Sequence, residues 1–258
     1  MRTRFSANLG FLWTELALPD AIRAAKAAGF DAVECHWPYD TDPADVAAAL
    51  RETGLPMLGL NTRRGDVAAG ENGLSALPGR GAEARAAIDE AIAYARATGT
   101  GAVHVMAGFA AGEAARAVFA ENLAHACDAA PDLTFLIEPL NHRDAPGYFL
   151  QGSTQARGII EAVGRPNLKL MFDCYHLQIL EGDLTRRLTD LLPLIGHVQF
   201  AGVPDRGPPD RGEVNYAHVF AHLGRLGWDR PLGAEYRPGG PTGASLDWLR
   251  AFQGGPGG

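Results

Sequence analysis

Four apolar runs of the sequence each end in a side chain with a carboxylate or amide oxygen. They end at Glu138, Asp173, Gln199 and Glu235, so that successive ends lie 35, 26 and 36 residues apart (138 to 173, 173 to 199 and 199 to 235). Pro139 cannot donate to a sheet, so the first run reads as a strand that stops at its carboxylate. A charge inside a core is costly unless it is paired or bound to a metal. The pattern therefore predicts one shared site in which all four side chains bind a divalent cation.

The types of these ligands indicate the ion. Oxygen ligands favour a hard cation such as Mg²⁺ or Mn²⁺ over Zn²⁺. A single acid at a strand end is as readily half of a structural ion pair, so the prediction depends on the four side chains occurring together.

Further polar residues follow the same predicted strands. For each, the alternative is a structural role: a loop hydrogen bond, a surface charge or an ion pair. His197 shares a strand face with Gln199 and is expected behind the ligands, as is Glu34, which ends an earlier strand. The expected substrate-binding residues are Asn8, His142, His176 and Arg206, the last of these as a fork for a carboxylate.

Short apolar strands alternate with alanine-rich helical stretches along the whole chain. Strands are predicted at 4–8, 32–34, 56–60 and 102–106 and before the four polar ends. Helices are predicted at 19–28, 43–52, 82–98, 113–130, from 153 or 154, and at 183–191, 216–226 and 244–252. The eight units predict a single (β/α)₈ TIM barrel over residues 1–253, with a disordered tail at 254–258. Two long loops, 61–81 and 201–215, fall on the face where such barrels keep their active sites.

The composition restricts the partners and the location. The net charge is −7, and an acidic chain gains nothing from releasing phosphate counterions, so nucleic acid is not expected as a partner. No apolar run is long enough for a membrane span, and no signal peptide is recognised. The three cysteines form no CxxC pair, which fits a reducing cytoplasm. A small hydroxy or oxo acid is the expected partner, and a homo-oligomer is possible.

The chain contains a set of specific motifs: RFSANL at 4–9, AAGENGL at 68–74, IEPLNH at 137–142, FDCYHLQ at 172–178, GHVQ at 196–199 and GEVNY at 212–216. Together these motifs resemble the hydroxypyruvate isomerase family, one of the xylose isomerase-like barrels, and the likeness runs from about Arg4 to Phe252. The resemblance implies that Glu138 and Glu235 act as an acid/base pair and also bind the metal, with Asp173 and Gln199 completing the metal shell.

The same resemblance implies a reaction: hydroxypyruvate and tartronate semialdehyde would interconvert by proton transfer through a metal-stabilised enediolate. Relatives that isomerise 2-oxo-tetronates share these motifs, so the substrate stays open. Ketose 3-epimerases usually have histidine at the position of Gln199 and arginine at that of His142. The loop at 204–213 also differs from the isomerase pattern. Two further classes of protein are disfavoured: the acidic charge argues against a DNA-repair endonuclease, and the two glutamates argue against a non-catalytic sugar-acid-binding protein.

Overall fold

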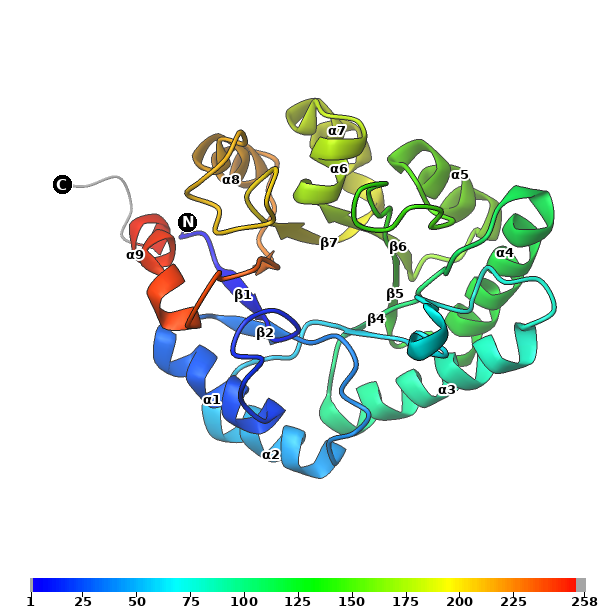
Figure 1. The fold of residues 1–258 in the computed structure, drawn as a ribbon, viewed down its shortest axis with the longest axis horizontal. Coiled ribbons are helices and arrows are strands. Elements are labelled where there is room, and N and C mark those ends of the chain that lie inside the picture. Colours follow the sequence, from blue (N-terminus) through cyan, green and yellow to red (C-terminus); the bar gives the residue numbers. More distant parts are fainter. Residues whose placement is uncertain (1, 254–258) are drawn as a thin grey trace.

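Eight short parallel strands alternate with helices and pair in the order β2-β1-β8-β7-β6-β5-β4-β3 (Figure 1). The structure is a computed structural model that describes residues 2–253. The ring closes between β2 and β3, where Val33 N donates to Pro56 O and Leu58 N donates to Val33 O. The predicted (β/α)₈ barrel is thereby confirmed. The strands are β1 (Phe5–Asn8), β2 (Ala32–Glu34), β3 (Leu60–Asn61), β4 (Ala102–His104), β5 (Thr134–Ile137), β6 (Leu168–Asp173), β7 (Ile195–Phe200) and β8 (Leu232–Ala234).

The helices form the outer ring, and their ends follow local sequence signals. Pro19 lies in the first turn of the first helix, and Gly29 ends that helix at a φ of 94°, a conformation that glycine adopts without strain. Asp42 caps the next helix by accepting from Ala44 N. The helices are α1 (Leu18–Ala28), α2 (Pro43–Thr53), α3 (Gly81–Thr98), α4 (Gly112–Ala129), α5 (Ser153–Val163), α7 (Leu184–Leu191), α8 (Tyr216–Arg225) and α9 (Asp247–Gln253).

The predicted elements differ from the structure mainly in four places. The third strand was expected at 56–60, whereas β3 covers Leu60–Asn61. An additional helix, α6 (Cys174–Leu180), begins directly after Asp173, where a loop was expected. Gly152 stands at the N-cap of α5, because the N–H and hydroxyl of Ser153 both bond to Glu181 instead. The predicted last helix is divided into a 3-10 turn at Thr242–Ser245 and α9. The predicted disordered tail at 254–258 lies outside the described residues.

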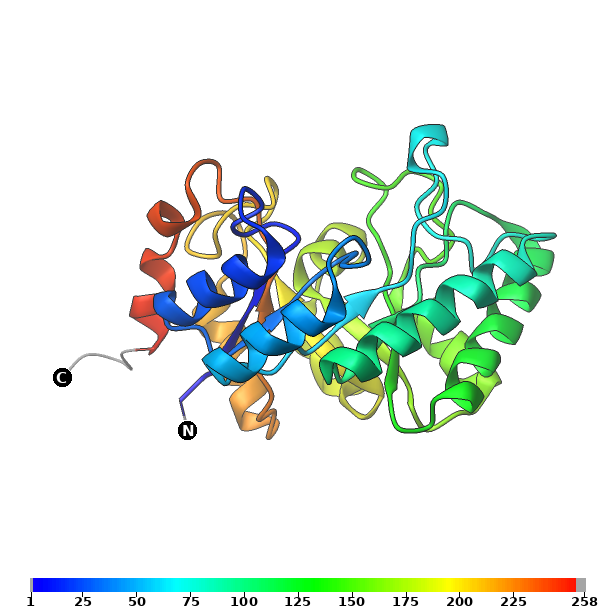
Figure 2. The ribbon, with the colours of Figure 1, turned by 90° about the horizontal axis from the view of Figure 1, so that it is seen from below.

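The long loops rise on one side of the barrel (Figure 2). The β3–α3 loop, which contains the 3-10 turn Val67–Ala69, projects on the side where the strands end, and the N-terminal segment lies on the opposite side. Phe5 of β1 and Phe200 of β7 pack edge-on against Trp248 of α9, with ring centroids 5.2 and 5.4 Å away. No helix among residues 2–253 is long and apolar enough to cross a membrane.

Candidate active site

The four predicted ligands come from four neighbouring strands. Asp173 and Gln199 lie in β6 and β7, and Glu138 and Glu235 directly follow β5 and β8. All four are buried, with at most 6% of each residue exposed. Three oxygens among them, Glu138 Oε1, Asp173 Oδ2 and Gln199 Oε1, are buried without a hydrogen-bond partner. Buried polar atoms are rarely left unpaired. These oxygens therefore fit a hard divalent cation.

Asp173 is fixed by the helix that follows it. Its Oδ1 accepts from Tyr175 N at 2.8 Å and so caps α6, while Oδ2 is left for the site. The cap also sets the position of His176 in the first turn of α6. Asp173 therefore contributes to the site and also caps the helix that follows β6.

Glu235 is held at both of its oxygens. Oε1 lies 2.7 Å from His36 Nε2 and accepts from Asn8 Nδ2 at 3.0 Å. Oε2 accepts from Arg206 Nη2 at 2.6 Å, which leaves a lone pair on that atom. Gly10 makes room for His36, because a Cβ at that position would lie 2.1 Å from His36 Nδ1.

A fourth buried carboxylate, Glu34, lies behind the ligands and orients Gln199. Its Oε1 accepts from Gln199 Nε2 at 3.0 Å and from Asn8 Nδ2 at 3.1 Å, and its Oε2 lies 2.5 Å from His197 Nε2. Because the Nε2–H of Gln199 donates to Glu34, the Oε1 atom of Gln199 is left without a hydrogen-bond partner and is available to an ion. Gly233 provides the space, since a Cβ there would lie 2.5 Å from Glu34 Oε1.

His176 lies beside the carboxylates, and its nitrogen atoms can be assigned. Nδ1 accepts from Asn141 N at 2.9 Å, so the neutral ring carries its proton on Nε2. Nε2 lies 3.7 Å from Asp173 Oδ2 and 4.0 Å from Glu138 Oε1. Glu138, Asp173 and His176 together have the spacing of a metal site. A protonated Nε2 is a donor, however, so Gln199 and Glu235 suit the shell better than His176.

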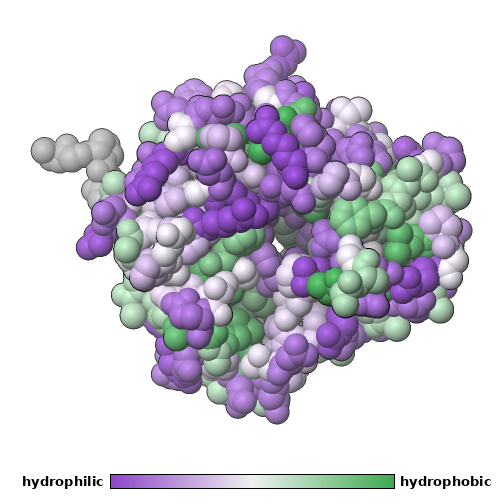
Figure 3. Space-filling view, in the orientation of Figure 1, coloured by the Kyte–Doolittle hydropathy of each residue, from purple (hydrophilic) through white to green (hydrophobic). Residues whose placement is uncertain are grey.

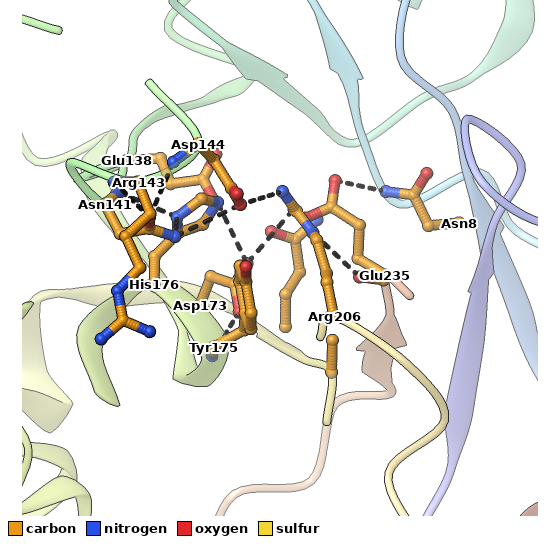
Figure 4. Close-up of polar contacts among 12 residues, drawn as sticks. Asn8, Glu138, Asn141, Arg143, Asp144, Asp173, Tyr175, His176, Arg206 and Glu235 are labelled. Atoms are coloured by element: carbon orange, nitrogen blue, oxygen red, sulfur yellow. Dashed lines mark hydrogen bonds and ion pairs between the residues drawn. The ribbon is translucent and has the colours of Figure 1, made fainter. Parts of the chain in front are cut away.

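Arg206 lies among the carboxylates and contacts Asp144, Asp173 and Glu235 (Figure 4). Nη2 lies 3.6 Å from Asp173 Oδ2, and Nη1 lies 3.5 Å from Asp144 Oδ2. The guanidinium also lies over the rings of Phe11 and Tyr175. The fork expected to take a substrate carboxylate is therefore occupied by the protein's own acids.

The two glutamates lie in opposite electrostatic environments. Burial, followed by the charges of Glu235 and Asp173, raises the pKa of Glu138 well above its usual range. Burial also raises the pKa of Asp173 to about 7, although Arg206 opposes the rise. Burial would raise the pKa of Glu235 too, but Arg206 and His36 outweigh it and lower that pKa. Glu138 thus favours the protonated form and Glu235 the ionised form.

Glu138, His176 and Glu235 line a cavity of about 200 Å³ at the centre of the mouth. Figure 3 shows this hollow from the side of the long loops, with hydrophilic residues beside the ends of β7 and β8. Phe11, Trp37, Met106 and Leu140 form its apolar wall. Drug-sized ligands occupy pockets of roughly 300–1,000 Å³, so this cavity suits a smaller molecule.

The structure does not bring every predicted residue into the cavity. His142 is exposed and is absent from the lining. The buried residues Asp173, Gln199, Asn8, His197 and Glu34 are also absent from it. Sequence reasoning missed four titratable lining residues: His36, His104, Asp144 and Arg237. His104 had a usable signal, because it ends β4 as the four ligands end or follow theirs. His36 lies two residues beyond the strand end at Glu34, and Arg237 two beyond Glu235, which are weaker signals.

Comparison with known proteins agrees with this fold. The sequence profile described as a xylose isomerase-like TIM barrel matches residues 22–252. A 2-oxo-tetronate isomerase from Cupriavidus necator is 46% identical, over 97% of this chain and 99% of that one. A putative hydroxypyruvate isomerase from Homo sapiens is 45% identical, over 96% and 95%. The crystal structure of a Brucella melitensis protein named AP endonuclease, family 2, superposes with a TM-score of 0.93 at 39% identity, over 97% and 99%.

The closed parallel barrel, with its acids at the strand ends, is that of a xylose isomerase-like enzyme. Within this class, the chain belongs to the hydroxypyruvate isomerase family, whose members match it over nearly their full length.

Proposed function

We propose that the protein isomerises a small 2-oxo or hydroxy acid, with hydroxypyruvate and tartronate semialdehyde as the pair. One observation carries this proposal: Glu138 and Asp173 have buried oxygens without hydrogen-bond partners and lie, with His176, at the spacing of a metal site, and Glu138 and Glu235 line a cavity of about 200 Å³. Moving a carbonyl between adjacent carbons requires a proton to leave one carbon and return to the next. Two buried carboxyl groups at one small site are the groups for this task.

The proposed metal shell is Glu138, Asp173, Gln199 and Glu235, with Mg²⁺ or Mn²⁺ as the ion. Such a cation would stabilise the substrate oxygens on which negative charge develops. Glu34 holds the oxygen of Gln199 toward the ion position, and the α6 cap holds Asp173 Oδ2 there.

We assign proton abstraction to Glu235 and proton delivery to Glu138. Arg206 and His36 keep Glu235 ionised, as an abstracting base requires, and Glu138 is the other buried glutamate that lines the cavity. His176 Nε2–H points at the carboxylates and is positioned to donate to a substrate oxygen. Asn8 positions Glu235 instead of contacting substrate, since its amide donates to Glu235 and Glu34.

NMR in D₂O tests the proposal. Purified protein with Mg²⁺ is incubated with hydroxypyruvate, and tartronate semialdehyde should form with deuterium at the exchanging carbon. The same assay with 2-oxo-tetronate and with a ketose compares the three substrate classes. Turnover of ketoses alone would assign the protein to epimerisation, and product formed without any solvent deuterium would indicate a hydride shift.

The 2-oxo-tetronate reaction remains the second candidate. The relative named for it shares 46% identity with this chain, and the one named for hydroxypyruvate shares 45%. The relative turnover of the two acids, measured as kcat/KM, decides between them.

A further inference from the structure

Arg237 is an arginine that lines the cavity and has no acid to pair with. It lies two residues beyond Glu235, and its side chain is exposed. Among residues 2–253, its guanidinium makes no ion pair or side-chain hydrogen bond, in contrast to Arg206. Its backbone N–H donates to Arg206 O at 2.7 Å, which ties this segment to the rim of the site.

An anionic substrate meets an unfavourable field in this cavity. Glu138, Asp144 and Glu235 all line it. Arg206 is the countercharge of the acids around it, so little of its charge is left for a ligand. The apolar wall offers no cation. Like charges held together in a buried site are strongly unfavourable, so a carboxylate needs its own positive partner.

We propose that Arg237 binds the carboxylate of the substrate and makes the site selective for acids over neutral ketoses. This inference rests on the proposed function and names the group that selects its substrate class. The free guanidinium offers two parallel N–H donors, which match a carboxylate in geometry. The carboxylate then lies on the β8 rim, and the carbons that exchange protons lie deeper, between Glu235 and Glu138.

The test compares a carboxylate with a neutral molecule of similar size. Binding of glycerate and of dihydroxyacetone is measured by calorimetry for the wild type, Arg237→Ala and Arg237→Lys, and the KM for hydroxypyruvate is measured in parallel. Arg143→Ala is the matched control, because Arg143 lies near the mouth but points away from the carboxylates (Figure 4).

Loss of a charge-assisted fork should weaken glycerate binding and raise the KM by about 10- to 100-fold in Arg237→Ala. Dihydroxyacetone binding should not change. Lysine keeps the charge but not the fork, so Arg237→Lys should restore part of the loss, and Arg143→Ala should behave as the wild type. Wild-type glycerate affinity in Arg237→Ala, or an equal loss for both ligands, overturns the inference.

These outcomes are separate from the fate of the proposed function. If the wild type isomerises hydroxypyruvate and Arg237→Ala binds glycerate normally, the proposed function is supported and the role of Arg237 is refuted. If the wild type isomerises no acid but binds glycerate in a manner dependent on Arg237, the proposed function is refuted and the carboxylate site is supported.

Discussion

The Nη2 atom of Arg206 lies 2.6 Å from the Oε2 atom of Glu235, and both side chains are buried. The positive charge of Arg206 lowers the pKa of three buried acids, Glu138, Asp173 and Glu235. Arg206 also has a positive φ of 54°, a conformation that is uncommon for a residue with a side chain. The loop therefore holds the arginine in a strained backbone conformation where the acids need it.

Replacing Arg206 with alanine should destabilise the protein and impair turnover of every substrate. Removing one partner of a buried ion pair typically costs ~3–5 kcal/mol, which urea unfolding measures. Without Arg206 the pKa of Glu235 should rise, so the acid limb of the kcat/KM profile should move to higher pH. Arg143→Ala is the control for loss of charge. An Arg206→Ala variant with unchanged stability and an unchanged pH profile would show that the pair does not govern Glu235.

The charge-neutral variants Glu138→Gln and Glu235→Gln test proton transfer. Each keeps the shape and an oxygen but loses the base, so kcat should fall by at least ~10²-fold, with a smaller change in KM. Exchange of the substrate C–H with solvent should fall most in Glu235→Gln, because Glu235 is the proposed abstracting base. Either variant with near-wild-type turnover would lose its acid/base role and remain a ligand only.

Removal of metal should change how stability depends on pH. The folded-state pKa values of Glu138 and Asp173 are raised, so the folded protein keeps protons that the unfolded chain has released. Stability should therefore fall as pH rises from ~4 to ~7 in EDTA-treated protein. The lowered pKa of Glu235 acts only below this window.

Added Mg²⁺ or Mn²⁺ binds the deprotonated acids, so its effect on Tm should grow with pH. Thermal unfolding across this range, with and without the ion, makes the comparison. An ion that changes neither Tm nor activity at any pH would leave the acids to act alone.

Gly10 leaves room for the ring of His36 and does not line the cavity itself, so a substitution there tests the role of His36. Gly10→Ala should displace His36, because the new Cβ would lie 2.1 Å from His36 Nδ1. Glu235 then loses a hydrogen bond and a neighbour that lowers its pKa. We expect a lower kcat and a higher pKa on the acid limb, with the fold retained by circular dichroism. Gly240→Ala is a matched glycine control in the loop after β8, where no atom lies within 4 Å of the new Cβ.

The strand ends were predictable because polar residues interrupt apolar runs at intervals of one strand and one helix. Glu138, Asp173, Gln199 and Glu235 could therefore be grouped without coordinates. The residues that contact these four side chains could not be predicted in the same way. Arg206 reaches Glu235 from a loop whose backbone conformation has no simple sequence signature, and His36 reaches the same carboxylate across 199 positions of sequence. His142 shows the converse, since adjacency to a site residue in sequence did not bring it into the cavity.

The cap that Asp173 places on α6 also restricts its denticity. Because Oδ1 accepts from Tyr175 N, Oδ2 is the oxygen left without a hydrogen-bond partner, and monodentate binding through Oδ2 keeps the cap intact. Ca²⁺ favours six to eight oxygens and often takes carboxylates by both atoms, whereas Mg²⁺ accepts single oxygens in an octahedron. A backbone hydrogen bond at the start of a helix thereby biases this barrel toward the smaller ion.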